Sequence, residues 1–189
     1  MRKSAIPVYK LTYSALCLAM SFVLPFVTGN IPEFGNMLCP MHFPVLLCGF
    51  LCGWQWGLSV GFVAPLMRSL ILMRPPLYPT AIAMTFELAA YGLLAGLFYY
   101  LLCGRRGRIY IALTGAMLGG RIVGGLMQAI LLSVNGDGYT IAVFFTEYFA
   151  KAWPGILVQL ILIPVVVSAL RKAKLNFNER DENHDGKTV

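Results

Sequence analysis

The chain alternates long apolar runs with short polar breaks in which glycine, proline, asparagine and arginine gather. A bilayer core about 30 Å thick takes a helix of roughly 20 residues, so runs of this length predict membrane-spanning helices. The second run is short for a full span, and Pro40 and Pro44 at its start predict an irregular entry. The pattern therefore predicts an all-α membrane protein, a six-transmembrane-helix bundle, with helices at Leu11–Thr28, His42–Cys52, Trp54–Met73, Pro79–Leu102, Ile109–Val134 and Thr140–Leu170.

The composition agrees with this prediction. Hydrophobic residues make up 58% of the chain and charged residues 12%, whereas a soluble domain carries about 25% charged residues. Six spans leave no room for a second folded domain in 189 residues. We expect residues 1–172 to form one membrane domain and residues 173–189 to form a polar, disordered cytoplasmic tail.

The basic residues predict the orientation. Three clusters flank the apolar runs, and they hold nine of the fifteen lysines and arginines: Arg2, Lys3, Lys10; Arg105, Arg106, Arg108; and Arg171, Lys172, Lys174. With six spans the clusters fall on one side, and cytoplasmic loops are the ones enriched in lysine and arginine. We therefore expect the N and C termini to be cytoplasmic, and we assign the +7 net charge to membrane topology rather than to a nucleic-acid partner.

Ionisable residues interrupt the apolar runs. A charge at bilayer depth costs at least about 2.5–3.5 kcal/mol, so such residues mark functional sites by default. At a rise of 1.5 Å per residue, they fall in one layer about 10–17 Å below the outer edge, on helices that run in both directions. This convergence predicts a polar substrate-binding pocket that opens outward, lined by Arg68, Glu87, Arg121, Glu147 and Lys151.

Other residues extend or compete with this pocket. Gln128 lies two turns beyond Arg121 on the same helix face, Asn36 belongs to the first outer loop, and Tyr91 offers a stacking ring. Glu147 and Lys151 are four residues apart, so an ion pair between them is an alternative to ligand contact. We interpret His42 as a hydrogen-bonded interfacial histidine rather than a ligand-binding one.

Small residues predict close helix packing. Glycines surround Arg121 on the fifth helix, and Gly-xxx-Gly spacing is the usual packing device in membranes. Cys48 and Cys52 share a helix face, but no second Cys or His pair stands at ligand spacing, so we expect no metal site and interpret the cysteines as packing residues. Ala15 and Ala19 form a small-xxx-small pair on the first helix, which suits docking on another membrane protein.

Taken together, these features resemble the substrate-binding (S) components of energy-coupling factor (ECF) transporters, the vitamin uptake systems of prokaryotes. The resemblance rests on six helices with both termini inside, on the Ala15-xxx-Ala19 motif, and on charged residues in helices four to six. The segments 35–42, 44–50, 65–69 and 79–84 also look like members of this family, and the similarity covers about residues 8 to 172.

The resemblance implies a high-affinity binder of one vitamin in a prokaryotic cell membrane, with an outward pocket closed by the first, third and fifth loops. It implies that Ala15 and Ala19 dock on a transmembrane coupling (T) subunit. Two partner ATPase subunits would hydrolyse ATP, so the chain itself would need no cofactor. The remaining partners would be the vitamin and the lipid bilayer.

The substrate and two other function classes stay open. The five buried groups sum to three positive and two negative charges, and Arg74 at the rim adds a positive charge, which favours a carboxylate such as pantothenate, with folate, niacin and biotin as competitors. A small membrane enzyme using His42, Glu87 or Glu147 as acid or base is one alternative, although we find no nucleophile or metal set. A membrane scaffold whose buried charges only pair with one another is the other.

Overall fold

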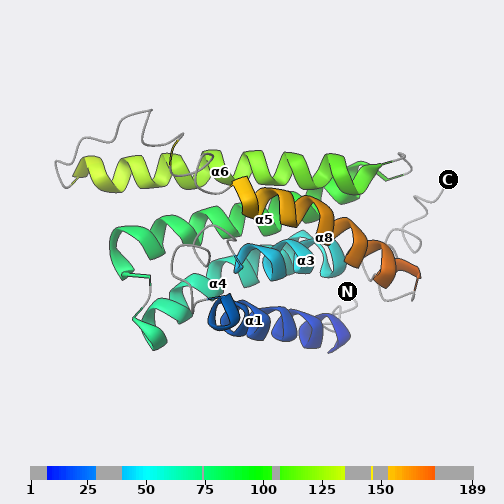
Figure 1. Cartoon of the computed structure of the whole chain (residues 1–189), viewed down its shortest axis with the longest axis horizontal. Coiled ribbons are helices and arrows are strands. Elements are labelled where there is room, and N and C mark those ends of the chain that lie inside the picture. The colour runs from blue at the N-terminus through cyan, green and yellow to red at the C-terminus, as the bar shows by residue number, and fades with distance from the viewer. Residues whose placement is uncertain are drawn as a thin grey trace, which may run out of the picture.

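The computed structural model describes residues 8–28, 40–73, 75–103, 107–134, 146 and 153–172, and the elements within these ranges are helical. Figure 1 shows the long helices running side by side along one axis of the molecule. Within these described ranges, five helices are long and apolar enough to cross a membrane. The elements are α1 (Val8–Thr28), α3 (His42–Cys52), α4 (Trp54–Leu72), the π-helical turn η1 (Leu77–Ala81), α5 (Ile82–Leu101), α6 (Arg108–Val134) and α8 (Trp153–Lys172).

These helices match the predicted runs closely. Helix α1 begins three residues before the predicted Leu11, and α4 ends one residue early because Met73 takes a left-handed backbone conformation with φ 53°. Before α5, the predicted first turn at Pro79 is the π-helical turn η1. The predicted start of the last helix at Thr140 lies outside the described residues, which resume with α8 at Trp153.

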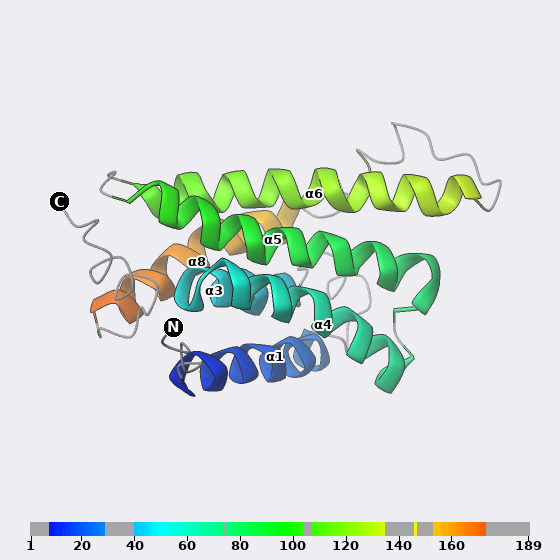
Figure 2. The same ribbon diagram turned by 180° about the vertical axis from the view of Figure 1, so that it is seen from behind.

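Helix α3 is the element that departs from a simple bundle. Its 11 residues rise only about 16 Å, roughly half of a bilayer core. Gly53, at φ 98°, joins the end of α3 directly to α4. Ten residues of α3 are buried. Figures 1 and 2 show α3 in the half of the bundle where α8 ends, so this helix begins away from both ends of the bundle. The prediction of a short second helix is therefore confirmed.

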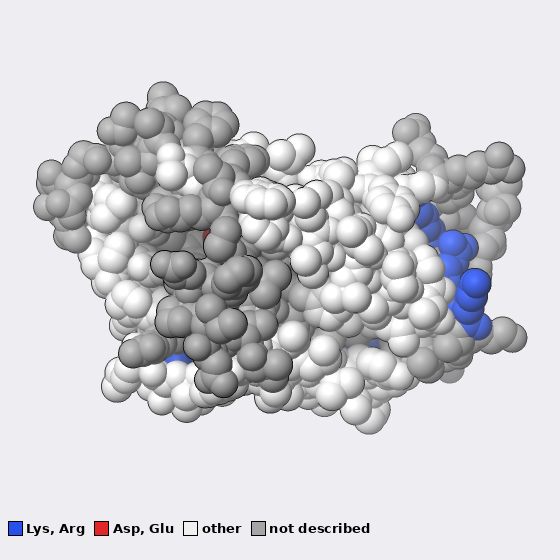
Figure 3. All heavy atoms as spheres, viewed as in Figure 1, with Lys and Arg blue, Asp and Glu red and all other residues white. Residues whose placement is uncertain are grey.

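Basic residues gather at one end of the bundle. The starts of α1 and α6 and the ends of α5 and α8 share this end, where Figure 3 shows lysine and arginine on the surface. Arg108 lies under this surface, only 7% exposed, and donates a 2.9 Å hydrogen bond to the Tyr99 hydroxyl. Its guanidinium also stacks 4.0 Å from the Tyr99 ring centroid. The shared end agrees with the predicted clustering, and the side of the membrane that it faces stays a prediction.

Glycines bring α3, α4 and α5 into backbone contact. A Cβ on Gly92 of α5 would overlap the Gly57 carbonyl of α4, and a Cβ on Gly49 of α3 would lie 2.6 Å from the Gly92 oxygen. Nearer the basic end, a Cβ on Gly96 would overlap the backbone of Trp54. This contact leaves no space for a side chain, so α5 is fixed against both neighbours at the centre of the fold.

Buried cysteines pack between α1 and α3. Cys17 of α1 and Cys48 and Cys52 of α3 are each at most 3% exposed, in agreement with their interpretation as packing residues. Ser14 of α1 lies 3.5 Å from the Cys48 sulfur. Ser14 and the buried cysteines therefore pack the inner face of α1 against α3.

We expect Gly92→Ala to destabilise the fold because the added methyl meets backbone that cannot move aside. Overpacking costs about 1–3 kcal/mol, which exceeds the helix-propensity gain of up to about 1 kcal/mol for Gly→Ala. Gly119→Ala is the matched control, since its methyl would meet only the end of the flexible Leu94 side chain. Thermal unfolding in detergent should show a lower Tm for Gly92→Ala alone; equal Tm values would contradict the close-contact account.

Candidate ligand-binding site

A buried carboxylate lies where α3, α5 and α6 meet. Glu87 of α5 is 5% exposed and is the single acidic residue among those that the structure describes. Its Oε1 lies 3.5 Å from Nε2 of His42, the first residue of α3. When Nε2 carries the ring proton, the imidazole donates this hydrogen bond to the carboxylate. The pair gives Glu87 the partner that a carboxylate at bilayer depth requires.

Tyr91 completes this polar cluster one turn further along α5. Its ring meets the His42 ring edge-on, with centroids 5.0 Å apart and an interplanar angle of 73°. Tyr91 is fully buried and His42 is 5% exposed. The imidazole is thus fixed from two sides, by a carboxylate and by an aromatic ring.

Glycines of α6 pack closely against this cluster. A Cβ on Gly124 would lie 2.8–2.9 Å from the Cβ, Cγ and Cδ of Glu87, and a Cβ on Gly120 would lie 2.9–3.0 Å from the Tyr91 ring. The prediction that these glycines serve close packing is confirmed. They pack against the polar side chains themselves, so the glycine stripe shapes the site as well as the helix contact.

The start of α3 adds electrostatic character. A helix that begins inside the bilayer presents backbone N–H groups and the positive end of its dipole at depth. The N-cap residue Met41 supplies no side-chain hydrogen bond. The Glu87 carboxylate contacts the side chain of the first helical residue, His42.

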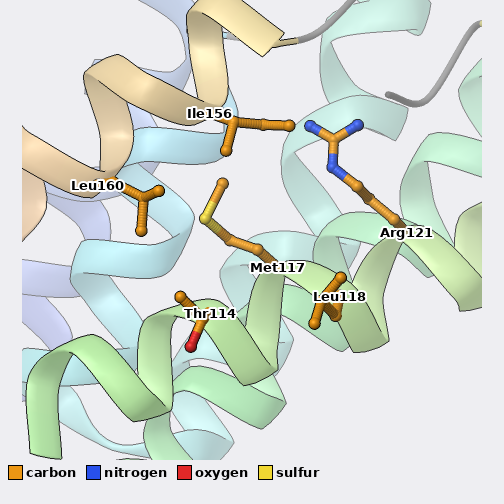
Figure 4. A pocket seen from close by; sticks show the side chains of 6 residues that line it. All are labelled: Thr114, Met117, Leu118, Arg121, Ile156 and Leu160. Atoms are coloured by element: carbon orange, nitrogen blue, oxygen red, sulfur yellow. The ribbon is translucent and has the colours of Figure 1, made fainter. Parts of the chain in front are cut away.

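Arg121 lies on the neighbouring side of α6. It is 3% exposed, and its guanidinium reaches toward Ile156 of α8 (Figure 4). It stands at one end of a cavity of about 260 Å³ between α6 and α8. The described lining residues are Thr114, Met117, Leu118, Arg121, Ile156 and Leu160.

The remaining described candidates lie around this centre. Gln128 is half-buried one turn beyond Gly124, on the side of α6 that carries the Glu87 contact. Arg68 is half-buried on α4, and its guanidinium lies 5.9 Å from the ring centroid of Phe26 on α1. The structure thus brings Glu87 and Tyr91 together against α6 and places Arg68 against α1. Near the end opposite the basic residues, the Tyr78 hydroxyl donates a 2.6 Å hydrogen bond to the Leu131 carbonyl, which ties the α4–α5 connection to α6.

The family model of the ECF transporter substrate-specific component matches residues 9–177 of the chain. The chain belongs to this family. Comparisons with curated proteins and with solved structures gave no match. The protein is therefore a transport protein of the membrane, the substrate-binding subunit of an ECF-type transporter, and its family implies association with T and ATPase components.

For this S component, several predicted site residues lie outside the described residues: Asn36, Arg74, Glu147 and Lys151. The alternative ion pair between Glu147 and Lys151 therefore stays a prediction, as does the closure of the pocket by the first and fifth loops. The same holds for the polar tail from residue 173 onward.

His42 is the residue that sequence reasoning left out of the site. The interpretation as a hydrogen-bonded histidine agrees with its Glu87 contact, but its interfacial placement is corrected, because it is buried within the bundle. A signal was present in the sequence. Histidine opens a run too short to span the bilayer, and a full-length run follows directly after Gly53, so one end of the short helix must lie at depth.

We expect a double-mutant cycle on His42→Leu and Glu87→Met to give a coupling free energy of about 0.5–3 kcal/mol. Each single change leaves one buried polar group without its partner, which costs about 1–3 kcal/mol, whereas the double change removes both groups. Equilibrium unfolding in mixed detergent micelles measures the four stabilities. A cycle pairing Glu87→Met with Thr12→Ala on the exposed face of α1 should be additive; additivity in the first cycle too would mean that the 3.5 Å contact carries no energy.

Proposed function

We propose that this S component binds a vitamin or related micronutrient that carries a carboxylate and that it delivers this ligand to an ECF transporter in a prokaryotic cell membrane. Pantothenate is the first candidate, with folate, niacin and biotin as alternatives. The observation that carries the proposal is Arg121, a residue that is 3% exposed inside the bundle and borders a cavity between α6 and α8.

An arginine in this place suits a carboxylate for two reasons. Its planar guanidinium holds five N–H donors and binds a carboxylate through two parallel hydrogen bonds, so it can keep other contacts at the same time. Its low-dielectric surroundings strengthen such a contact relative to water. Lys151 is the second proposed cation, and Arg68 the third.

The cluster of Glu87, His42 and Tyr91 gives the site hydrogen-bonding groups in addition to the Arg121 cation. A carboxylate and an imidazole accept hydrogen bonds from hydroxyl and amide donors, and Tyr91 and Gln128 offer further polar groups beside them. A ligand with a carboxylate at one end and hydroxyl or amide donors at the other would use both parts. Asn36 and Glu147 complete the proposed set of contacts.

We expect Arg121→Met to weaken ligand binding by about 2–5 kcal/mol, roughly thirty- to several-thousand-fold in Kd. The ligand is first identified by mass spectrometry of small molecules released from the purified protein, and the affinity is then measured by titration calorimetry. Arg171→Met, which removes a positive charge from the exposed end of α8, is the control and should bind normally. Unchanged affinity in Arg121→Met, or loss of its fold in a parallel thermal scan, would make Arg121 structural and favour the scaffold alternative.

The same function requires a docking surface for the T subunit, and we assign it to Ala15 and Ala19. Both are exposed on α1, on the side away from the α3 contact, and small side chains let a partner helix approach closely.

Ala15→Trp and Ala19→Trp should abolish co-purification with the T and ATPase subunits because bulk prevents this approach, while ligand affinity of the isolated protein stays unchanged. Leu126→Trp, at a position of α6 that is 60% exposed, is the control for added bulk on the membrane face. Normal assembly of the alanine variants would place the docking surface elsewhere.

A further inference from the structure

The His42 ring has one nitrogen that the Glu87 contact does not use. Its Nε2 lies 3.5 Å from Oε1 of Glu87, while Nδ1 is buried and has no hydrogen-bond partner among the residues that the structure describes. A buried polar atom without a partner costs free energy, so such atoms are rare in native proteins. The exposed fraction of His42 is only 5%, so bulk solvent does not supply the missing partner. A bound ligand would supply it.

The contact with Glu87 decides which kind of ligand group Nδ1 can bind. In a neutral imidazole one nitrogen carries the proton and the other accepts a hydrogen bond. An ionised carboxylate only accepts, so the Glu87 contact places the ring proton on Nε2 and leaves Nδ1 as the acceptor. Tyr91 packs edge-on against the same ring and fixes its orientation. The group that meets Nδ1 must therefore be a donor, such as a hydroxyl or an N–H.

A metal ion is the other partner that an unprotonated imidazole nitrogen binds, commonly with a carboxylate on the second nitrogen. A protein metal site takes several ligands of this kind. Within the described part of the chain, no three His, Cys, Asp or Glu side chains come together. The observations therefore favour a hydrogen-bond donor of the substrate over a metal ion.

The cluster and Arg121 lie at one level of the bundle. Gly120 of α6 packs against Tyr91, and Gly124 packs against Glu87. Arg121 falls between these two glycines in the sequence, within about 6 Å of rise along the helix axis. The side chains of His42 and Glu87 keep 6% and 7% of their surface exposed, so a narrow opening reaches the pair. A small ligand held by Arg121 at one end can thus present its other end to the cluster.

We propose that His42 contacts the substrate and determines its specificity, with Nδ1 accepting a hydrogen bond from a hydroxyl or N–H group of the ligand. This inference rests on the proposed function and narrows its substrate class to carboxylates that also carry a hydrogen-bond donor. Pantothenate has hydroxyl groups and an amide N–H, and folate and biotin have N–H groups. Nicotinate, the carboxylate form of niacin, has no donor, and its ring nitrogen is a second acceptor. The criterion counts against niacin.

The first test is NMR of the full chain in detergent micelles with ¹⁵N-labelled histidine. The chain has two histidines, so His184→Gln leaves His42 as the single labelled residue without altering the site. Pantothenate, folate, biotin and nicotinate are added in turn. Nδ1 should resonate as an unprotonated nitrogen, and its signal should shift when one of the three donor-bearing acids binds. A proton on Nδ1, or an Nδ1 signal that stays in place while the acid binds, would overturn the proposal.

The second test compares two substitutions of His42 by titration calorimetry with the acid that binds most tightly. Glutamine can place its amide N–H₂ near the Nε2 position and keep the Glu87 contact, but it has no acceptor at the Nδ1 position. Asparagine can place its carbonyl oxygen near Nδ1 but does not reach Glu87. His42→Gln should weaken binding about 5- to 150-fold, because the ligand donor loses its partner. His42→Asn should bind more tightly than His42→Gln; a purely structural histidine would give the opposite order, because the fold would depend on the Glu87 contact.

The outcomes separate this inference from the function on which it rests. Tight binding of nicotinate that is weakened by Arg121→Met would retain the carboxylate site and overturn the assignment of His42. Saturable binding of Zn²⁺ that is lost in His42→Gln would assign Nδ1 to a metal and overturn it as well. If none of the four acids binds, the proposed function fails and the inference fails with it. The NMR result decides even where a substitution of His42 unfolds the protein, since that experiment keeps His42 in place.

Discussion

The contact of α5 with glycines on both sides is the constraint on which the rest of the structure depends. On one side Gly92 meets the backbone of Gly57, and on the other Gly124 and Gly120 press on Glu87 and Tyr91. Helix association in lipid gains little from the hydrophobic effect and depends on close packing. Because the backbones approach so closely, the polar side chains of α5 are enclosed by protein instead of lipid, which is what allows a carboxylate to exist at this depth.

The short helix α3 also helps the fold to accommodate the buried Glu87 carboxylate. Because this helix begins at His42, it brings an imidazole to the level of Glu87. Burial of a carboxylate is tolerable when it is hydrogen-bonded, so the interrupted element and the buried charge require one another. Arg121 lies on the adjacent side of α6, and the fold thereby sets an acceptor cluster and a cation around one helix.

The bundle separates its binding and assembly surfaces. Polar groups converge on α5 and α6. Helix α1 packs on α3 through Cys17 and Ser14 of its inner face, with Ser14 beside Cys48 of α3, and it leaves Ala15 and Ala19 exposed. A partner can therefore approach α1 without touching the ligand site. This arrangement suits a family in which the subunit that binds substrate is distinct from the components that supply energy.

The sequence by itself determined the membrane class, the positions of the described helices within a few residues and the short second helix, because hydropathy, breakers and rise per residue are local properties; of the predicted layer of charge, Glu87 and Arg121 are buried. It also led to the family that the whole-chain comparison supports. Only the tertiary structure decided which polar residues meet. His42 contacts Glu87 across 45 positions in the chain, Arg68 lies against Phe26 of α1, and a cavity forms between α6 and α8 beside Arg121. Such pairings depend on helix rotation and crossing, which are set by glycine contacts between distant segments and leave no periodic signal in the chain.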